Sequence, residues 1–426
     1  MIPRKNSKFV KSALILLSIF LLISTAASAA VVKIGLNYPK TGPYSVQGLA
    51  QLRAANMAVE EINQTGGILG RTVELVVRNS QSKAPISKKN VEELIDKERV
   101  EMVFGGSSSA VAIAGGNAAK SRGKLYFGTL TYSNATTGVK AHKYMFRECY
   151  NAWMGAKVLS EYLKEHFSGK RYFYVTADYT WGWTTEASIR KFSRTLDKKR
   201  HKRVLTPFPG ATRENFPKAL AKAASSRAEG LVLVLFGKDM ADAVQLATEM
   251  GLKKKRSIVV PNLTLGMAAS AGPKAMEGVV GALPWSWKVP YTYNYAKGMA
   301  FVEAFANKYK SYPSTSAASA YTIMYQYKEA VERAGRFDAK AVISMLEGHK
   351  FTSLKDEQVW RAFDHQSTQT VYAVKCKPEA EVLKDKFKQD YFDIIKSMPG
   401  EKAARTKDRW TRTSKAAGLQ LAELQW

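Results

Sequence analysis

The chain alternates short apolar runs with longer amphipathic segments from Val31 onward. The first apolar run, 31–36, leads through the loop Thr41 to Tyr44 into a helical pattern at 50–63, and a second apolar run follows at 72–77. A strand, a helix and a second strand in this order form the unit from which parallel sheets are built. The pattern therefore predicts a parallel α/β fold.

Two series of such units follow one another, with a break near Cys149. The second series contains a strongly apolar run, 230–236, that is typical of a strand buried on both faces. Neither a low-complexity linker nor an internal repeat of about 20 to 50 residues is present. We therefore expect two similar α/β lobes, joined without a flexible tether.

The N-terminus has the pattern of an export signal. Residues 1–12 contain four Lys and Arg residues and no acid, 13–23 is apolar except for Ser18, and Ala27 to Ala29 is a small-residue cleavage motif. Cleavage would leave about 397 residues, enough for two hydrophobic cores. No cysteine follows the apolar run, so no lipid anchor is expected, and no later run is long enough to span a membrane.

The chain is strongly basic, with 65 Lys and Arg residues against 36 Asp and Glu and a formal net charge of +29. Much of the excess lies in two runs, 198–203 and 253–256. Such runs indicate either a polyanion or membrane-surface partner or simply solvated loops and helix ends, and we favour the solvated surface. Both runs lack the interleaved aromatic residues of a stacking platform, so no nucleic-acid partner is expected.

Motifs for catalysis and metal binding are missing from the sequence. It has no His-Glu-x-x-His, Cys-x-x-Cys, Walker or Gly-x-Ser-x-Gly motif, and its five histidines lack metal-ligand spacing. We expect no enzyme, no metal and no cofactor; the enzyme alternative, a hydrolase with Ser109 as nucleophile, has no recognisable base. The spacing of Cys149 and Cys376 leaves open whether a disulfide joins them.

Small hydroxyl and aromatic residues recur where predicted strands end. Ligands of open α/β sheets bind beyond the carboxyl ends of the strands, and hydroxyls and helix N-terminal amides suit a carboxylate. We therefore expect a small solute to bind between the two lobes. Two alternatives stay open: that the serines serve only to cap a helix, and that the aromatic residues serve only to pack the lobe. The strand-end residues are Thr41 and Tyr44, Ser107 to Ser109, Thr129 to Tyr132, Tyr179 and Trp181, and Asn262.

Several segments resemble the leucine/isoleucine/valine-binding proteins, which are periplasmic substrate-binding proteins of ABC transporters. The resemblance implies a type I periplasmic-binding fold, a periplasmic location, an ABC permease in the inner membrane as partner and a monomeric state. It extends over roughly 31–375. The matching segments are Lys33 to Gly35, Thr41 to Pro43, Ala58 to Asn63, Gly66 to Arg71, Gly105 to Ser109, Asp178 to Gly182 and Phe363 to Gln366.

The resemblance also implies how the chain is divided between the lobes. Three segments would cross the hinge, near Cys149, near 264–275 and between about 348 and 374. The implied segments are a signal peptide at 1–29, lobe 1 at 30–148 and again at 265–350, lobe 2 at 149–264, a hinge return with lobe 2 strands at 351–376, and a basic, helical C-terminal extension at 377–426.

By the same resemblance, the loops at 107–109 and 130–132 would hold the carboxylate and amino group of an amino acid. Ser109 would supply the carboxylate hydroxyl and Leu130 a backbone carbonyl, with Thr131 or Tyr132 as a further polar contact. The aromatic residue that covers the ligand would be Trp181. The implied ligand-binding residues are Tyr44, Gln47, Ser107, Ser108, Ser109, Leu130, Thr131, Tyr132, Tyr179, Trp181, Lys238 and Asn262.

One position departs from the family pattern. Amino-acid binders of this group place an acid where this chain has Asn262, and an amide supplies no charge for the ligand's ammonium group. Asp178 and Asp239 are the candidate substitutes. The sequence therefore predicts a receptor for a small amino acid of the branched-chain type or a related carboxylate. The alternative is a receptor for an aromatic or organic acid or an amide, and a more distant one is a polyanion-binding exported protein.

Overall fold

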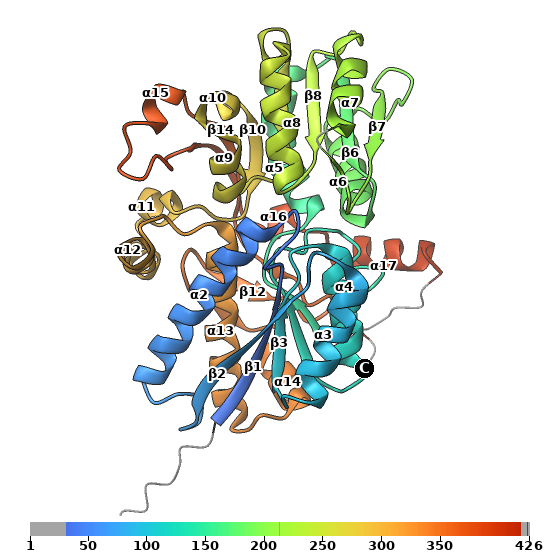
Figure 1. Ribbon diagram of the computed structural model, residues 1–426. Coiled ribbons are helices and arrows are strands. Elements are labelled where there is room, and N and C mark those ends of the chain that lie inside the picture. The colour runs from blue at the N-terminus through green and yellow to red at the C-terminus, as the bar shows by residue number, and fades with distance from the viewer. Residues whose placement is uncertain (1–30, 213, 419–423, 425–426) are drawn as a thin grey trace, which may run out of the picture.

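The computed structural model describes residues 31–212, 214–418 and 424, which form two lobes, one above the other in Figure 1. The predicted signal peptide at 1–29 lies outside the described residues. Within the described residues, no helix is both long enough and apolar enough to cross a bilayer. The predicted α/β class is confirmed, because each lobe contains a largely parallel sheet flanked by helices.

Lobe 1 is built on a five-stranded parallel sheet with the order β2-β1-β3-β4-β5. Alternate residues of its strands point to two separate apolar cores: Ile34 and Phe104 face α2 and α13, whereas Val103 faces α3 and α4. The strands are β1 (Val31–Tyr38), β2 (Thr72–Asn79), β3 (Met102–Gly105), β4 (Leu125–Gly128) and β5 (Met145–Arg147). The helices are α2 (Ser45–Gln64), α3 (Ala84–Asp96), α4 (Ser109–Lys120), α12 (Ala296–Tyr309), α13 (Thr315–Ala334) and α14 (Ala339–Leu346).

Lobe 2 is built on a seven-stranded sheet with the order β15-β14-β10-β9-β8-β6-β7. Every residue of the central strand β8 is buried, as its apolar run predicts. The strands are β6 (Tyr172–Ala177), β7 (Arg203–Thr206), β8 (Gly230–Val234), β9 (Ser257–Val260), β10 (Val280–Leu283), β14 (Val371–Cys376) and β15 (Phe392–Met398). The helices are α5 (Ala152–Phe167), α6 (Thr180–Phe192), α7 (Asn215–Ala224), α8 (Lys238–Glu249), the 3-10 turn η1 (Leu252–Lys254), α9 (Leu265–Ala271) and α10 (Pro273–Met276).

The chain returns to lobe 1 later than the sequence predicts. The expected boundary at 264 falls before α9 and β10, yet β10 pairs with β9 and with β14 inside the lobe 2 sheet. Gly281 permits this close pairing, because a Cβ atom there would lie 2.4 Å from the Val260 carbonyl oxygen. The second crossing therefore lies near Pro284, after which α11 (Lys288–Tyr293) begins.

Three crossings join the lobes and are tied to one another. The Gln369 amide of the third crossing donates to the Glu148 carbonyl of the first at 2.6 Å. The buried Lys355 ammonium donates to the Pro284 carbonyl of the second at 2.7 Å and to Gln369 Oε1 at 3.3 Å. Lys355 follows β11 (Lys350–Phe351) of the small sheet that β12 (Gln358–Trp360) and β13 (Ser367–Thr368) complete.

The C-terminal segment differs from the helical extension predicted for 377–426. After α15 (Glu379–Val382), β15 adds an antiparallel strand to β14, and then α16 (Gly400–Ala403) and α17 (Lys407–Ala416) follow. Trp410 of α17 is fully buried, and its indole N–H donates to the Thr137 carbonyl of lobe 1 at 2.9 Å. The segment thus forms part of both lobes, and α17 lies beside lobe 1 in Figure 1.

The two cysteines are not joined. Cys149 lies at the first crossing and Cys376 ends β14, and both are free, buried thiols. Burial in apolar surroundings raises the pKa of each thiol well above its usual range, so both are protonated and unreactive at neutral pH.

Truncation of Trp410 tests whether the C-terminal segment belongs to the fold. Trp410→Ala should lower the free energy of unfolding by about 3–5 kcal/mol, since it leaves a cavity and an unpaired Thr137 carbonyl. The matched control is Trp183→Ala, because the Trp183 side chain is half exposed; its effect should stay within about 1 kcal/mol. Urea unfolding measures both changes, and equally small losses would show that α17 contributes nothing to stability.

Candidate ligand-binding site

The loops that follow the parallel strands of the two lobes meet in one seam. The Tyr44 hydroxyl of lobe 1 and the Tyr179 hydroxyl of lobe 2 lie 2.9 Å apart. The Lys238 backbone N–H donates to the Pro43 carbonyl at 3.0 Å. The Ser133 hydroxyl lies 3.2 Å from that of Thr184 in α6. The lobes are therefore in direct contact, in a closed arrangement.

Aromatic rings from both lobes pack together in this seam. Phe236, in the loop after β8, lies edge-on to Tyr44, Tyr132 and Trp181, with ring centroids 5.1, 5.7 and 5.9 Å away. Phe208, beyond β7, stacks on Tyr44 at 5.3 Å and on Tyr179 at 4.1 Å. The predicted residues Tyr44, Tyr132, Tyr179 and Trp181 are thus brought together. Phe236 belongs to the loop 236–239 that the family resemblance places at the cleft, whereas Phe208 was missed, although it ends the predicted strand at 203–208.

Several buried polar atoms at the seam lack a hydrogen-bond partner among the described residues. Three are donors: the Ser108 hydroxyl, the Tyr132 hydroxyl and the Trp181 indole N–H. The side-chain oxygens of Gln47 and Gln51 are also unpaired. An unsatisfied buried group costs about 1–3 kcal/mol, so a polar ligand that pairs with these atoms would recover that free energy.

The three consecutive serines have different surroundings. Ser107 Oγ accepts from the Gln51 amide at 2.7 Å, and Ser109 Oγ accepts from the Ser133 backbone N–H at 2.9 Å. Ser108 occupies the position before α4, but its hydroxyl makes no capping bond. The alternative that Ser108 serves only to cap the helix is therefore wrong. Its hydroxyl and the free N–H groups of α4 form a surface suited to an anion.

Thr131 and Asn262 are committed to protein contacts. The Thr131 hydroxyl lies 2.8 Å from that of Thr136, while Leu130, in the same loop, is buried. The Asn262 amide donates to the Tyr150 hydroxyl at 2.8 Å, and that hydroxyl donates to the Ala282 carbonyl at 3.0 Å. Thr131 and Asn262 therefore hold the loops in place, and Gln47 Nε2 makes a long contact of 3.5 Å across the seam to Thr264.

Lys238, one of the predicted ligand-binding residues, has its side chain directed away from the seam. Lys238 is the first residue of α8, and its ammonium points outward to pair with Asp242 at 2.5 Å. Its side chain is 69% exposed, so only its backbone N–H takes part in the seam. The one-turn spacing of Lys238 and Asp242 explains the difference, because residues four apart on a helix face each other.

Asp239, the next residue, is the buried acid of lobe 2 at the seam. Its side chain is buried in the first turn of α8, and it acts electrostatically on the phenols of Tyr44 and Tyr179. Burial, and to a smaller extent the nearby charge of Asp242, raise the pKa of Asp239 to about 7, while the charge of Lys238 opposes the rise. Asp239 therefore changes charge near neutral pH.

Arg147, which the sequence analysis did not select, supports the lobe 1 loops. Its guanidinium is fully buried and donates to the Thr131 carbonyl at 2.8 Å, to the Ser133 carbonyl, and to the Thr137 hydroxyl. Its Nε donates to Gln366 Oε1 at 2.7 Å. Burial lowers the pKa of Arg147 to about 9, so it remains charged at neutral pH. The available signal was a single charged residue in the short predicted strand 144–147, whose other residues are Tyr, Met and Phe.

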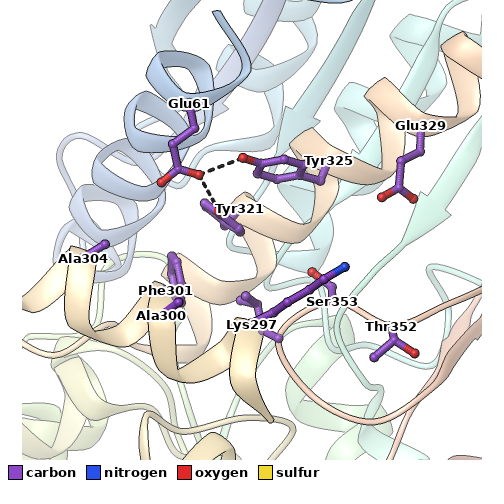
Figure 2. A pocket seen from close by; sticks show the side chains of 11 residues that line it. Glu61, Lys297, Ala300, Phe301, Ala304, Tyr321, Tyr325, Glu329, Thr352 and Ser353 are labelled. Atoms are coloured by element: carbon purple, nitrogen blue, oxygen red, sulfur yellow. Dashed lines mark hydrogen bonds between the residues drawn. The ribbon is translucent and has the colours of Figure 1, made fainter. Parts of the chain in front are cut away.

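A separate pocket lies on lobe 1 away from the seam, between α2, α12 and α13 (Figure 2). It has a volume of ≈ 380 Å³, and at one side the Glu61 carboxylate accepts from the hydroxyls of Tyr321 at 2.5 Å and Tyr325 at 2.7 Å. Phe301 and Lys297 come from α12. Its lining comes from α2, α12, α13 and the loop 352–354 after β11, without any residue of the lobe 2 sheet, so occupancy of this pocket would not draw the lobes together.

Comparison with known proteins agrees with this architecture. The family model described as "Periplasmic binding protein" matches residues 31–381. The Leu/Ile/Val-binding protein homolog 4 of Brucella melitensis is 22% identical over 375 residues, which cover 85% of this chain and 88% of that protein. A periplasmic binding protein from Burkholderia mallei superposes with a TM-score of 0.80 at 25% identity, covering 90% of this chain and 98% of that one.

Two further solved structures have the same fold and differ in what they hold. The branched-chain amino acid binding protein of Streptococcus pneumoniae, in complex with isoleucine, has a TM-score of 0.72 at 21% identity and covers 86% of this chain and 99% of its own. A solute-binding protein from R. palustris, in complex with benzoate, has a TM-score of 0.73 at 20% identity and covers 88% of this chain and 100% of its own.

The two-lobed fold and its interlobe seam define a solute-binding protein. The chain belongs to the periplasmic binding protein family, since the family model extends over most of its length. The resemblance and the fold inferred from the sequence are thereby confirmed.

Gly237 offers a test of the closed arrangement. It has φ +62°, and a Cβ atom there would lie 2.4 Å from both the Pro43 carbonyl oxygen and Tyr44 Cδ1. Gly237→Ala should therefore hold the lobes apart, which small-angle scattering would detect as a larger radius of gyration. Gly272→Ala is the control, because Gly272 also has positive φ but nothing within 4 Å of its Cβ position. Equal radii for both variants would contradict closure at this seam.

Proposed function

We propose that this protein is the periplasmic receptor of an ABC importer and that it binds a small carboxylate-bearing solute between its lobes. The observation that supports this most directly is the group of unpaired buried donors at the seam, Ser108, Tyr132 and Trp181. The predicted signal peptide would deliver the chain to the periplasm, and the closed, loaded form would be recognised by a membrane permease. The proposed role is capture and delivery, without catalysis.

A carboxylate fits this set of groups. Hydroxyl and indole donors, together with the N-terminal amides of α4, supply hydrogen bonds to an anion without a buried counter-charge. Tyr132 comes from the loop after β4 and Trp181 from the start of α6, so one ligand touching both would bridge the lobes. Bridging supplies the free energy by which a ligand favours the closed form over the open one.

The part of the ligand other than its carboxylate distinguishes two candidate classes of solute, amino acids and aromatic acids. Asp239 favours an amino acid, because its carboxylate would pair with the ammonium group in place of the acid missing at Asn262. The aromatic set around Phe236 favours an aromatic acid, because rings of this kind pack edge-on or offset on one another at such distances. Isoleucine and benzoate in the two structural relatives show that this fold accommodates both kinds of ligand.

A thermal-shift screen tests the proposed receptor function. Branched-chain amino acids and aromatic acids, each at about 100 times Kd, should stabilise the folded protein by about 2.7 kcal/mol through mass action. Ser108→Ala and Trp181→Phe should each weaken binding about tenfold, since each removes one donor to the ligand. Trp183→Phe, an exposed neighbour, should leave binding unchanged. A panel in which no small acid shifts the transition would count against the proposal.

The pH dependence of affinity separates the two ligand classes. Asp239 gains its charge as pH rises through about 7. An amino acid needs that charge, so its affinity should rise between about pH 5.5 and 8.5, whereas an acid without an ammonium group would be repelled and its affinity should fall. Calorimetric titration measures both, and Asp239→Asn should flatten either profile. A pH profile of the wild-type protein that matches that of the variant would show that the charge of Asp239 does not act on the ligand.

A further inference from the structure

The end of lobe 2 opposite the seam carries a dense group of cationic side chains. We call this group the distal basic surface. β6, β7 and β8 begin at this end and run toward the seam, so the surface and the seam lie at opposite ends of the same strands (Figure 1). Its members are Lys170, Arg171, Lys198, Lys199, Lys202 and Arg227.

These six cations have no ion-pair partner among the described residues. The two acids in the region are engaged by backbone groups: Asp197 accepts from the N–H groups of Lys199 at 2.9 Å and Arg200 at 3.2 Å, and Glu229 accepts from that of Arg171 at 3.3 Å. The positive charge at this end is therefore largely uncompensated, and it produces a strong local potential.

Two neighbouring cations in this lobe, in contrast, have a structural role. Arg200 donates to the Gly169 carbonyl beyond α5, and Arg256 donates to the Ala224 carbonyl at the end of α7 at 2.8 Å. Such bonds satisfy the free carbonyls at helix C-termini. None of the six members of the distal basic surface donates a side-chain hydrogen bond to another described residue. Lys170 lies over the Phe167 ring, 4.9 Å from its centroid, and the other five charges remain available to a partner.

A large apolar side chain lies within the same loop. Leu196 is 65% exposed and is flanked by Arg194 and Lys198, which are also exposed. Two adjoining hollows of ≈ 500 and ≈ 560 Å³ open beside it, and both are lined by Arg200 and Asp197. An exposed leucine among cations is the arrangement found where a protein surface meets the headgroup layer of an anionic membrane.

We propose that the distal basic surface docks on a bilayer rich in anionic phospholipids, with Leu196 entering the headgroup layer. Lysines dominate the surface and no exposed ring accompanies Leu196 in the loop 193–202, which favours lipid over nucleic acid, whose single strands are held by stacking on aromatic rings. Docking at this end leaves the seam open to solute. The proposal is independent of the proposed receptor function, because none of its residues lies at the seam.

Vesicle co-sedimentation tests the proposal. The full chain should bind vesicles of phosphatidylglycerol and phosphatidylcholine at low salt, release them at high salt, and ignore pure phosphatidylcholine. The double variant Lys199→Glu/Lys202→Glu should lower partitioning at least about 30-fold, from about fivefold per cation removed. The variant Leu196→Gln should also lower partitioning onto the vesicles, without changing its salt dependence.

The control is Lys88→Glu/Lys89→Glu on α3, which makes the same change in net charge at exposed positions of lobe 1. It should change partitioning less than about threefold. An equal loss in both double variants would overturn the proposal, since net charge alone would then drive binding. Failure of the wild-type chain to bind anionic vesicles would also overturn it, as would binding to heparin alone. Unchanged urea midpoints would show that all variants fold.

Discussion

The buried guanidinium of Arg147 is the interaction on which the rest of the site depends. It is the last residue of β5, where the chain leaves lobe 1, and its donors hold the carbonyls of Thr131 and Ser133 and the side chain of Gln366. Gln366 in turn donates to the Cys149 carbonyl at 2.8 Å. The Arg147 side chain thus fixes the loop that presents Tyr132 and joins this loop to the hinge. The cost is a buried positive charge whose hydrogen-bond partners are all neutral.

From this rigid base, the seam combines two properties that favour a small bound solute. It is lined by tightly packed rings, with Phe236 in contact with residues of both lobes. It also keeps the donors of Ser108, Tyr132 and Trp181 without partners among the described residues. The rings that pack across the seam stabilise the closed form whether or not a solute is present, whereas the buried donors without partners oppose closure of the empty protein. A solute that forms hydrogen bonds with these donors removes that cost and makes closure of the lobes favourable.

The sequence predicted the fold and most of the seam because strand-end loops are set by local patterns. Ser108 lies in the loop after β3 and Trp181 in the first turn of the helix after β6, and parallel topology brings such strand ends together. Long-range geometry was less predictable. Lys238 has its backbone at the seam and its side chain outside it, which no one-dimensional pattern distinguishes. Phe236 and Asp239 lie at the seam because of the way the start of α8 is oriented toward Tyr44. That orientation is decided by contacts between the two lobes, whose residues are far apart in sequence.

The central claim is that a solute lies between the lobes in contact with the three unpaired donors. A crystal structure of the protein with the best ligand from the thermal-shift screen tests it most directly. The account predicts ligand density within hydrogen-bonding distance of Ser108, Tyr132 and Trp181, with the lobes closed as described here. Density confined to the lobe 1 pocket beside Glu61, or a seam that stays free of ligand at saturating concentration, would contradict it.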